Sequence, residues 1–268
     1  MSGLTRRDAL RSGGMLIAIG AIGAACASNE AGGTPGRIGI APPPPTLPEV
    51  EDPPSDVTLL RTAQSIEYSA LELYKALMAT GTLNADESAV FERMVQDHTR
   101  HAGEIGQLIT GAGGSEFACA NQFFMNRSVN PALAAMEGSD DAHRDVLNIA
   151  WAFESVFGAS YQSFVRMLQG LDLRTAAAFH AGEEQRHATV LARMINPEHT
   201  FSPTFAGQPE EKDADGFPIP YAIPSVFGRV SPIELVVGAV TEEGSRFSIQ
   251  LQTPAQNTFV YEYMSCPA

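Results

Sequence analysis

Two short segments of the chain follow one pattern: Asp97-His98-Thr99-Arg100-His101 and Glu183-Glu184-Gln185-Arg186-His187. They lie 86 residues apart, and each sits in a stretch where apolar residues recur at steps of three and four. Such spacing predicts amphipathic helices. The second and fifth residues of each segment are three positions apart, so we expect them on the same buried face of a helix.

A second repeated pair has nearly the same offset. Glu67 precedes Tyr74 by seven residues, and Glu154 precedes Tyr161 by seven residues. The two glutamates are 87 residues apart. This repetition predicts two related helix pairs, which would bring all of these groups to a shared centre.

Four stretches of the chain have helical periodicity and few helix-breaking residues: 56–80, 85–111, 140–170 and 172–195. Short links join the first helix to the second and the third to the fourth, whereas residues 112–138 form a long link. This connectivity is typical of a four-helix bundle with one crossover. We therefore expect an all-α fold whose bundle occupies residues 56–196.

The predicted buried stripes of the four helices are apolar at both ends and polar in the middle. Buried carboxylates need partners, because leaving one unpaired in the core is costly. No Lys or Arg falls on these stripes at mid-height, whereas a divalent cation suits mixed carboxylate and imidazole ligands. The candidate metal ligands are Glu67, His98, His101, Glu154, Glu184 and His187.

These residues resemble the ferritin-like di-metal carboxylate superfamily, in which two helices each supply one Glu and two others each supply Glu-x-x-His. The resemblance covers about residues 57–196. Within the superfamily, Ile66-Glu67-Tyr68, Glu72-Leu73-Tyr74 and Glu183-Glu184-Gln185-Arg186-His187 most resemble the exported, rubrerythrin-related group that includes desiccation-associated proteins.

The resemblance implies a role for each matching residue. Glu67 and Glu154 would be terminal ligands, Glu184 a bridging ligand, and His101 and His187 nitrogen ligands. Around these ligands, Tyr74 and Tyr161 would hydrogen-bond the carboxylates, and His180 would be a neighbour of the ligands or a further ligand.

The second helix departs from the family pattern, because His98-x-x-His101 stands where Glu-x-x-His is expected. One bridging carboxylate is lost, and an imidazole would ligate one metal without bridging two. We therefore expect one or two ions in an asymmetric site, with Fe preferred over Mn or Zn. Glu72 and Glu183 lie off the buried stripes and are expected to be solvated.

The N-terminus has the pattern of a secretory signal over residues 1–27. Arg6-Arg7 precedes a short apolar run at 15–25, which indicates the twin-arginine route although Ala9 replaces the usual Phe. Two alternatives stay open for Cys26: it becomes a lipidated first residue, or cleavage after Ala27 removes it. Residues 28–55 are rich in Pro and Gly and are predicted to be an extended linker.

The two other cysteines, Cys119 and Cys266, are expected to form one disulfide in an exported chain, the alternative being two buried thiols. Residues 197–268 are predicted to form a C-terminal extension. Residues 197–230 would wrap the surface, and 246–252 alternates in polarity and would pair with 258–263 as a β-hairpin.

Charge and composition narrow the function. The chain has 17 Lys and Arg against 31 Asp and Glu, a net charge of −14, which argues against nucleic acid as a partner and against adhesion to anionic membranes. The only membrane attachment expected is a lipid on Cys26.

We expect a periplasmic, envelope or extracellular metalloprotein that acts as an oxidoreductase on O2, peroxide or Fe(II), with a homodimer as a plausible assembly. The alternative is a non-catalytic structural or stress-related protein whose centre is degenerate.

Overall fold

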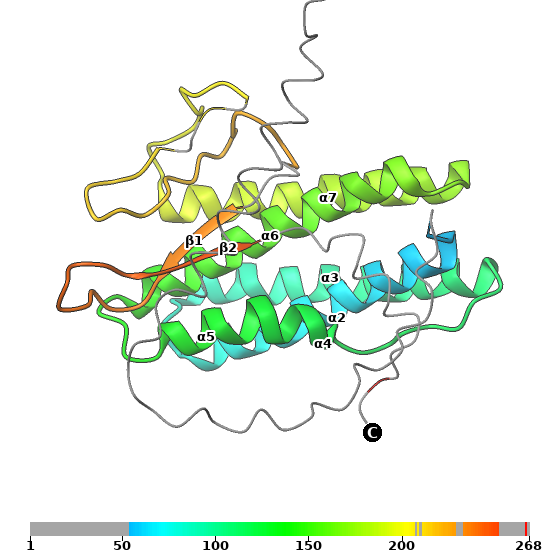
Figure 1. Ribbon diagram of the computed structural model, residues 1–268, viewed down its shortest axis with the longest axis horizontal. Helices are drawn as coiled ribbons and strands as arrows, with labels where there is room; N and C mark the ends of the chain where they lie inside the picture. Colours follow the sequence, from blue (N-terminus) through cyan, green and yellow to red (C-terminus); the bar gives the residue numbers. More distant parts are fainter. Residues whose placement is uncertain (1–53, 207, 209–210, 229–232, 252–265, 267–268) are drawn as a thin grey trace, which may run out of the picture. The chain divides into compact units, whose positions relative to one another are not determined.

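The computed structural model describes residues 54–206, 208, 211–228, 233–251 and 266. The expectations for the signal, Cys26 and the linker lie outside these residues. Four long helices form the main body, which confirms the predicted bundle (Figure 1). They are α2 (Asp56–Ala79), α3 (Ala85–Gly111), α6 (Ala142–Met167) and α7 (Leu171–Ile195).

Helices α2 and α3 pack as one pair and α6 and α7 as the other, each joined by a short link. The crossover between the pairs contains short helical elements that the sequence did not predict: α4 (Gln122–Phe124), a π-helical turn η1 (Met125–Val129) and α5 (Asn130–Met136). Pro131 stands at the start of α5, where its missing N–H breaks no hydrogen bond. The crossover thus adds apolar side chains to the core.

Carboxylate and amide side chains near the starts of α2 and α3 fix the ends of the bundle. Asn84 and Glu87 form a reciprocal capping box at the start of α3. Asp56, in the first turn of α2, accepts hydrogen bonds from the backbone N–H groups of Gln169 (2.7 Å) and Gly170 (3.2 Å). Because those two residues form the link between α6 and α7, this carboxylate ties the two helix pairs together at one end of the bundle.

A two-stranded antiparallel sheet packs against α6. Strand β1 (Ile233–Val237) pairs with β2 (Phe247–Leu251), and Asp145 of α6 accepts a hydrogen bond from the backbone N–H of Gly238 at 2.8 Å. The expected pairing of β2 with residues 258–263 stays a prediction, because 258–263 lies outside the described residues. The sequence missed β1 because its apolar residues run almost continuously and do not alternate.

The described residues between α7 and β1 have little regular structure, as expected. They follow the surface of α6 and α7: Thr189 donates a hydrogen bond to the backbone oxygen of Ala222 (3.0 Å), and Arg144 lies 3.5 Å over the ring of Phe217. Among the described helices, none has the length and hydrophobicity needed to cross a bilayer.

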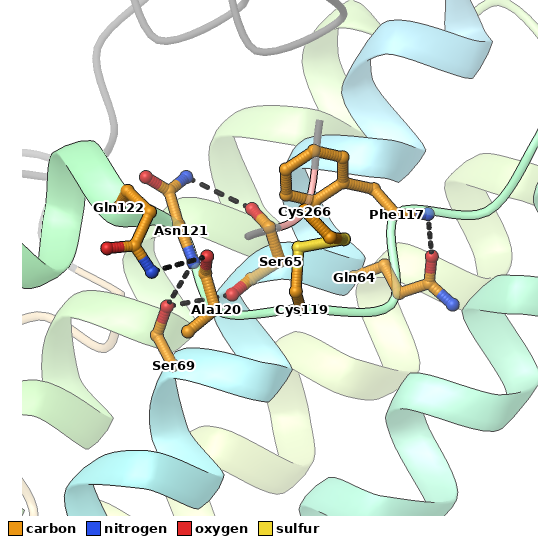
Figure 2. Close-up of a disulfide and its surroundings, with 9 residues drawn as sticks. All are labelled: Gln64, Ser65, Ser69, Phe117, Cys119, Ala120, Asn121, Gln122 and Cys266. Atoms are coloured by element: carbon orange, nitrogen blue, oxygen red, sulfur yellow. Dashed lines mark hydrogen bonds between the residues drawn. A yellow bond between two sulfur atoms is a disulfide. The ribbon is translucent and has the colours of Figure 1, made fainter. Parts of the chain in front are cut away.

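The predicted disulfide between Cys119 and Cys266 is confirmed (Figure 2). Beside it, the crossover is fastened to α2 by hydrogen bonds: Phe117 N–H donates to the side chain of Gln64 (2.7 Å), and Asn121 N–H donates to the Ser69 hydroxyl (2.9 Å). The disulfide therefore joins the end of the chain to an ordered part of the crossover.

Candidate metal centre

The six predicted ligands meet in the middle of the bundle. Helix α2 supplies one carboxylate, α3 two imidazoles, α6 one carboxylate, and α7 one of each. Each of the six ligand residues is at most 8 % exposed. The ligands are Glu67, His98, His101, Glu154, Glu184 and His187.

The first half of the centre lies between α2, α3 and α7. The Nδ1 atom of His98 is 2.7 Å from Glu67 Oε2, and the Nδ1 atom of His101 is 2.9 Å from Glu184 Oε1 and 3.6 Å from Glu67 Oε2. Donor atoms of these four residues all lie within 4.8 Å of one another, so they can hold a metal ion together.

The second half lies between α3, α6 and α7. The Nε2 atom of His98 is 3.0 Å from Glu154 Oε1, and the Nδ1 atom of His187 is 3.3 Å from an oxygen of Glu154 and from one of Glu184. These residues also form a group of four with donor atoms within 4.8 Å. His98 and Glu184 belong to both groups, so they stand between the two halves.

Two buried tyrosines connect the halves crosswise. Tyr74 of α2 donates a hydrogen bond to Glu154 of α6, and Tyr161 of α6 donates one to Glu67 of α2. Burial, together with the nearby carboxylates, raises the pKa of both phenols well above the usual value. Both hydroxyls therefore stay protonated and act as donors to the terminal carboxylates.

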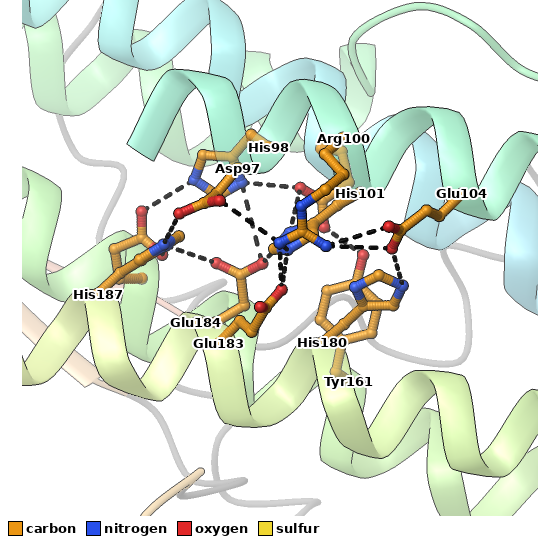
Figure 3. Close-up of polar contacts among 12 residues, drawn as sticks. Asp97, His98, Arg100, His101, Glu104, Tyr161, His180, Glu183, Glu184 and His187 are labelled. Atoms are coloured by element: carbon orange, nitrogen blue, oxygen red, sulfur yellow. Dashed lines mark hydrogen bonds and ion pairs between the residues drawn. The ribbon is translucent and has the colours of Figure 1, made fainter. Parts of the chain in front are cut away.

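Two further carboxylates hold the outer edges of the histidines (Figure 3). Glu183 of α7 lies 2.5 Å from Nε2 of His101 on α3, and Asp97 of α3 lies 3.4 Å from Nε2 of His187 on α7. When the ring loses its second proton to a metal, this outer N–H donation leaves Nδ1 to face the centre with its lone pair. Glu183 is thus partly buried against His101 and partly solvated, whereas Glu72 is exposed as expected.

The sequence contained a signal for this pair of outer carboxylates. Asp97 and Glu183 are the first residues of the two repeated segments, so the repeat includes them as well as the ligands. Their position about 100° away from the buried stripe concealed their role, because a long side chain reaches sideways along the helix to the neighbouring helix.

His180 lies next to the centre but belongs to neither of its two donor groups. Its ring centroid is 4.6 Å from that of His101 and 5.3 Å from that of Tyr161. Burial and the positive charge of His101 lower the pKa of His180, so its ring is neutral. Its Nδ1 atom has no hydrogen-bond partner among the described residues.

The neighbouring carboxylates raise the pKa values of all three histidines in the centre. Burial alone would lower the pKa of His98, but the charges of Glu184 and Glu154 outweigh burial and raise it to about 10. Carboxylate contacts likewise outweigh burial and raise the pKa of His101 to about 11, and that of His187 to about 11.

The pKa values of the three carboxylates shift in opposite directions. Burial tends to raise the pKa of Glu67 and Glu154, but hydrogen bonds and charges from the histidines prevail and lower it. Burial and the other two carboxylates raise the pKa of Glu184. The histidine protons thus supply, in the metal-free protein, the positive charge that the stripes lack.

The donor set fits a transition metal. The Oε2 atom of Glu184 is buried and lies 3.3 Å from Nδ1 of His187, which places a carboxylate oxygen and an imidazole nitrogen together inside the centre. Three carboxylates and three imidazoles whose positions are set by neighbouring side chains suit Fe, Mn or Zn.

A four-helix bundle with one crossover, whose buried core holds facing glutamates and histidines, defines the class of carboxylate bundle proteins that can bind metal ions. The ferritin-like domain family matches residues 55–197, just over half of the chain, and the chain belongs to this family. No curated protein and no solved structure matches the chain.

Metal binding is expected to release protons and to strengthen as the pH rises. Each histidine ligand must lose a proton before its lone pair can bind a metal, and the raised pKa values of 10 to 11 mean that all three rings are protonated at neutral pH. Calorimetric titration with Zn²⁺ in buffers of different ionisation enthalpy measures the protons released. Between about pH 6 and 8, which lies below these raised pKa values, zinc binding should release protons. Binding without proton release would contradict the assignment.

Proposed function

We propose that this protein is an exported metalloprotein that holds one or two transition-metal ions, Fe before Mn or Zn, and acts as an oxidoreductase on O2, peroxide or Fe(II). The observation that supports this proposal most is the pair of four-residue donor groups that share His98 and Glu184 in a fully buried centre. A redox-active metal held by these residues would supply the electrons for reaction with oxygen or peroxide.

The residues of the chain divide the work between binding and positioning. Glu67 and His101 would bind one ion and Glu154 and His187 the other, with Glu184 placed to contact both. Tyr74 and Tyr161 donate hydrogen bonds to the terminal carboxylates, which hold each carboxylate in its orientation. These carboxylates thus need little reorganisation on metal binding.

His98 makes the two halves unequal. Its two ring nitrogens face opposite carboxylates, Glu67 and Glu154. A neutral imidazole has one lone pair, so His98 would ligate one ion and donate its remaining N–H to the carboxylate on the other side. We propose that one ion is bound more tightly than the other for this reason.

Apolar and aromatic side chains keep the centre dry. Phe157 lies edge-on to the ring of His98, and Phe91 lies edge-on to Tyr74, each fully buried or nearly so. The Tyr74 hydroxyl also contacts the sulfur of Met94 at 3.1 Å. Exclusion of water strengthens the interaction between a bound cation and the carboxylates.

The proposal is tested by loading the purified protein with Fe(II) under anaerobic conditions, counting iron per chain, and then following oxygen consumption. We expect one or two tightly bound ions and oxygen uptake that depends on the protein. A protein that binds no Fe, Mn or Zn, and whose melting temperature ignores all three, would refute the proposal.

A second candidate function is a structural or stress-related envelope protein with no chemistry at the centre. The contacts of His98 favour it, because a protonated His98 bridges Glu67 and Glu154 without any metal. Tight metal binding without oxygen or peroxide turnover would select this alternative over the oxidoreductase.

Export and assembly complete the proposal. The disulfide is compatible with an oxidising compartment, which supports export to the periplasm, the cell envelope or the medium. The twin-arginine route, the lipid on Cys26 and a homodimeric assembly are part of the same proposal and rest on the sequence.

A further inference from the structure

Met94 of α3 lies in the wall of the buried centre. It precedes His98 by one helical turn, so both side chains lie on the same buried face of the helix. The residue is only 2 % exposed, and its sulfur lies 3.1 Å from the hydroxyl oxygen of Tyr74. A thioether is thus held inside the protein beside a side chain that contacts a proposed metal ligand.

Tyr74 connects this sulfur to the centre. Its hydroxyl donates a hydrogen bond to Oε1 of Glu154, and the same carboxylate oxygen lies 3.0 Å from Nε2 of His98. A phenol has a single proton, and an ionised carboxylate accepts it far more strongly than a thioether does, so the sulfur keeps its lone pairs available. One phenol oxygen therefore separates the Met94 sulfur from an oxygen of a proposed ligand.

The depth of Met94 distinguishes it from the other methionines that the structure describes. An oxidant dissolved in water attacks accessible sulfurs first, because the reagent must touch the sulfur. Met94 is shielded from such attack, whereas the other methionines of the described residues are only partly buried. These comparison methionines are Met78, Met125, Met136, Met167 and Met194.

We propose that Met94 is the internal reductant of the centre, and that hydrogen peroxide reaching the centre oxidises it to the sulfoxide when no other electron donor is present. The O–O bond of the peroxide breaks, an S–O bond forms, and the sulfur gives up two electrons. The second peroxide oxygen leaves as water with both protons. The inference rests on the proposed function, because a metal ion in the centre would draw the peroxide to this buried place.

A thioether suits this role because it takes up an oxygen atom without breaking the chain or losing its place in the core. The sulfur is the only atom of Met94 that can do so, and packing alone does not require it. Leucine has a similar volume and fills such a position at little cost to stability. Replacement of Met94 by leucine therefore removes the chemistry and keeps the packing.

The experiment loads the full chain with Fe(II) in the absence of oxygen, adds an equimolar amount of hydrogen peroxide, and locates the added oxygen by fragment mass spectrometry. We expect Met94 to be oxidised about tenfold more than any comparison methionine, which reverses the order that access to solvent dictates. In the metal-free protein, the same amount of peroxide should oxidise Met94 least.

Three variants separate the requirements of the reaction. Met94→Leu should keep the iron content of the wild type and gain no oxygen at position 94. Glu184→Ala removes the carboxylate that both donor groups share, so it should reduce oxidation of Met94 to the level of the metal-free protein. The matched control is Met167→Leu, which replaces a partly buried methionine at the end of α6 and should leave the oxidation of Met94 unchanged.

The outcomes distinguish the inference from the proposed function. Iron that is retained while Met94 stays reduced overturns the inference and leaves the proposed function standing. Equal oxidation of Met94 in the iron-loaded, metal-free and Glu184→Ala proteins also overturns it, because dissolved peroxide would then be the cause. Selective oxidation of Met94 without any oxygen consumption supports the inference and restricts the proposed function to peroxide. A chain that retains no iron overturns both.

Discussion

Replacement of Glu184 by alanine is expected to abolish metal binding at the buried centre. Glu184 is the one carboxylate common to both donor groups, and its side chain is fully buried between His101 and His187. Its loss leaves each group with a single carboxylate, which is too little negative charge to replace the hydration of a divalent ion. Elemental analysis after dialysis against Fe(II) or Mn(II) measures the ions retained per chain.

The matched control is Glu72→Ala. Glu72 lies on α2 within two turns of Glu67, but its side chain is exposed, so its removal should leave the metal content unchanged. Glu184→Gln separates charge from packing, because the amide keeps the volume of the carboxylate. Equal metal content in the Glu184 and Glu72 variants, with helicity preserved, would show that the ligands have been assigned to the wrong residues.

Removal of the disulfide is expected to produce the largest loss of stability. The bond between Cys119 and Cys266 spans 147 positions of the sequence. In the chain-entropy account, closing so long a loop restricts the unfolded chain and contributes about 4–5 kcal/mol to the free energy of unfolding. Urea denaturation of the Cys119→Ser, Cys266→Ser variant against the oxidised wild type measures this difference.

Reduction provides the control for that experiment. A thiol reductant should lower the stability of the wild type to that of the double variant, and it should leave the double variant itself unaffected. The hydrogen bonds of the crossover to Gln64 and Ser69 do not involve the cysteines, so we expect both proteins to keep them and local unfolding there to contribute little. A difference below about 1 kcal/mol would mean that the unfolded chain is already compact or that the bond carries strain.

The bundle and its ligands could be predicted from local sequence patterns. Helical periodicity located the four long helices to within three residues at each end, because the apolar residues that a helix buries recur every three or four positions. The same stripes showed which polar residues are buried. Glu67 and Glu154 stood out because polar groups are rare at such positions.

Features that depend on side-chain reach or on distant pairing were missed. Asp97 and Glu183 lie off the stripe of their own helices and act on histidines of the opposite helix, so periodicity within one helix does not reveal them. Strand β1 was not predicted, because most of its residues are buried and they do not alternate regularly in polarity.

By itself, the sequence determined the helix pairs, the burial of three carboxylates among histidines, and the disulfide, because each depends on residue type and spacing along the chain. Only the tertiary structure decided how these groups meet. Tyr74 donates a hydrogen bond to Glu154, and Tyr161 donates one to Glu67. His98 turns one ring nitrogen to Glu67 and the other to Glu154. These contacts form because the two helix pairs pack face to face. Contacts between helices follow from packing direction and side-chain length, which no single segment of sequence contains.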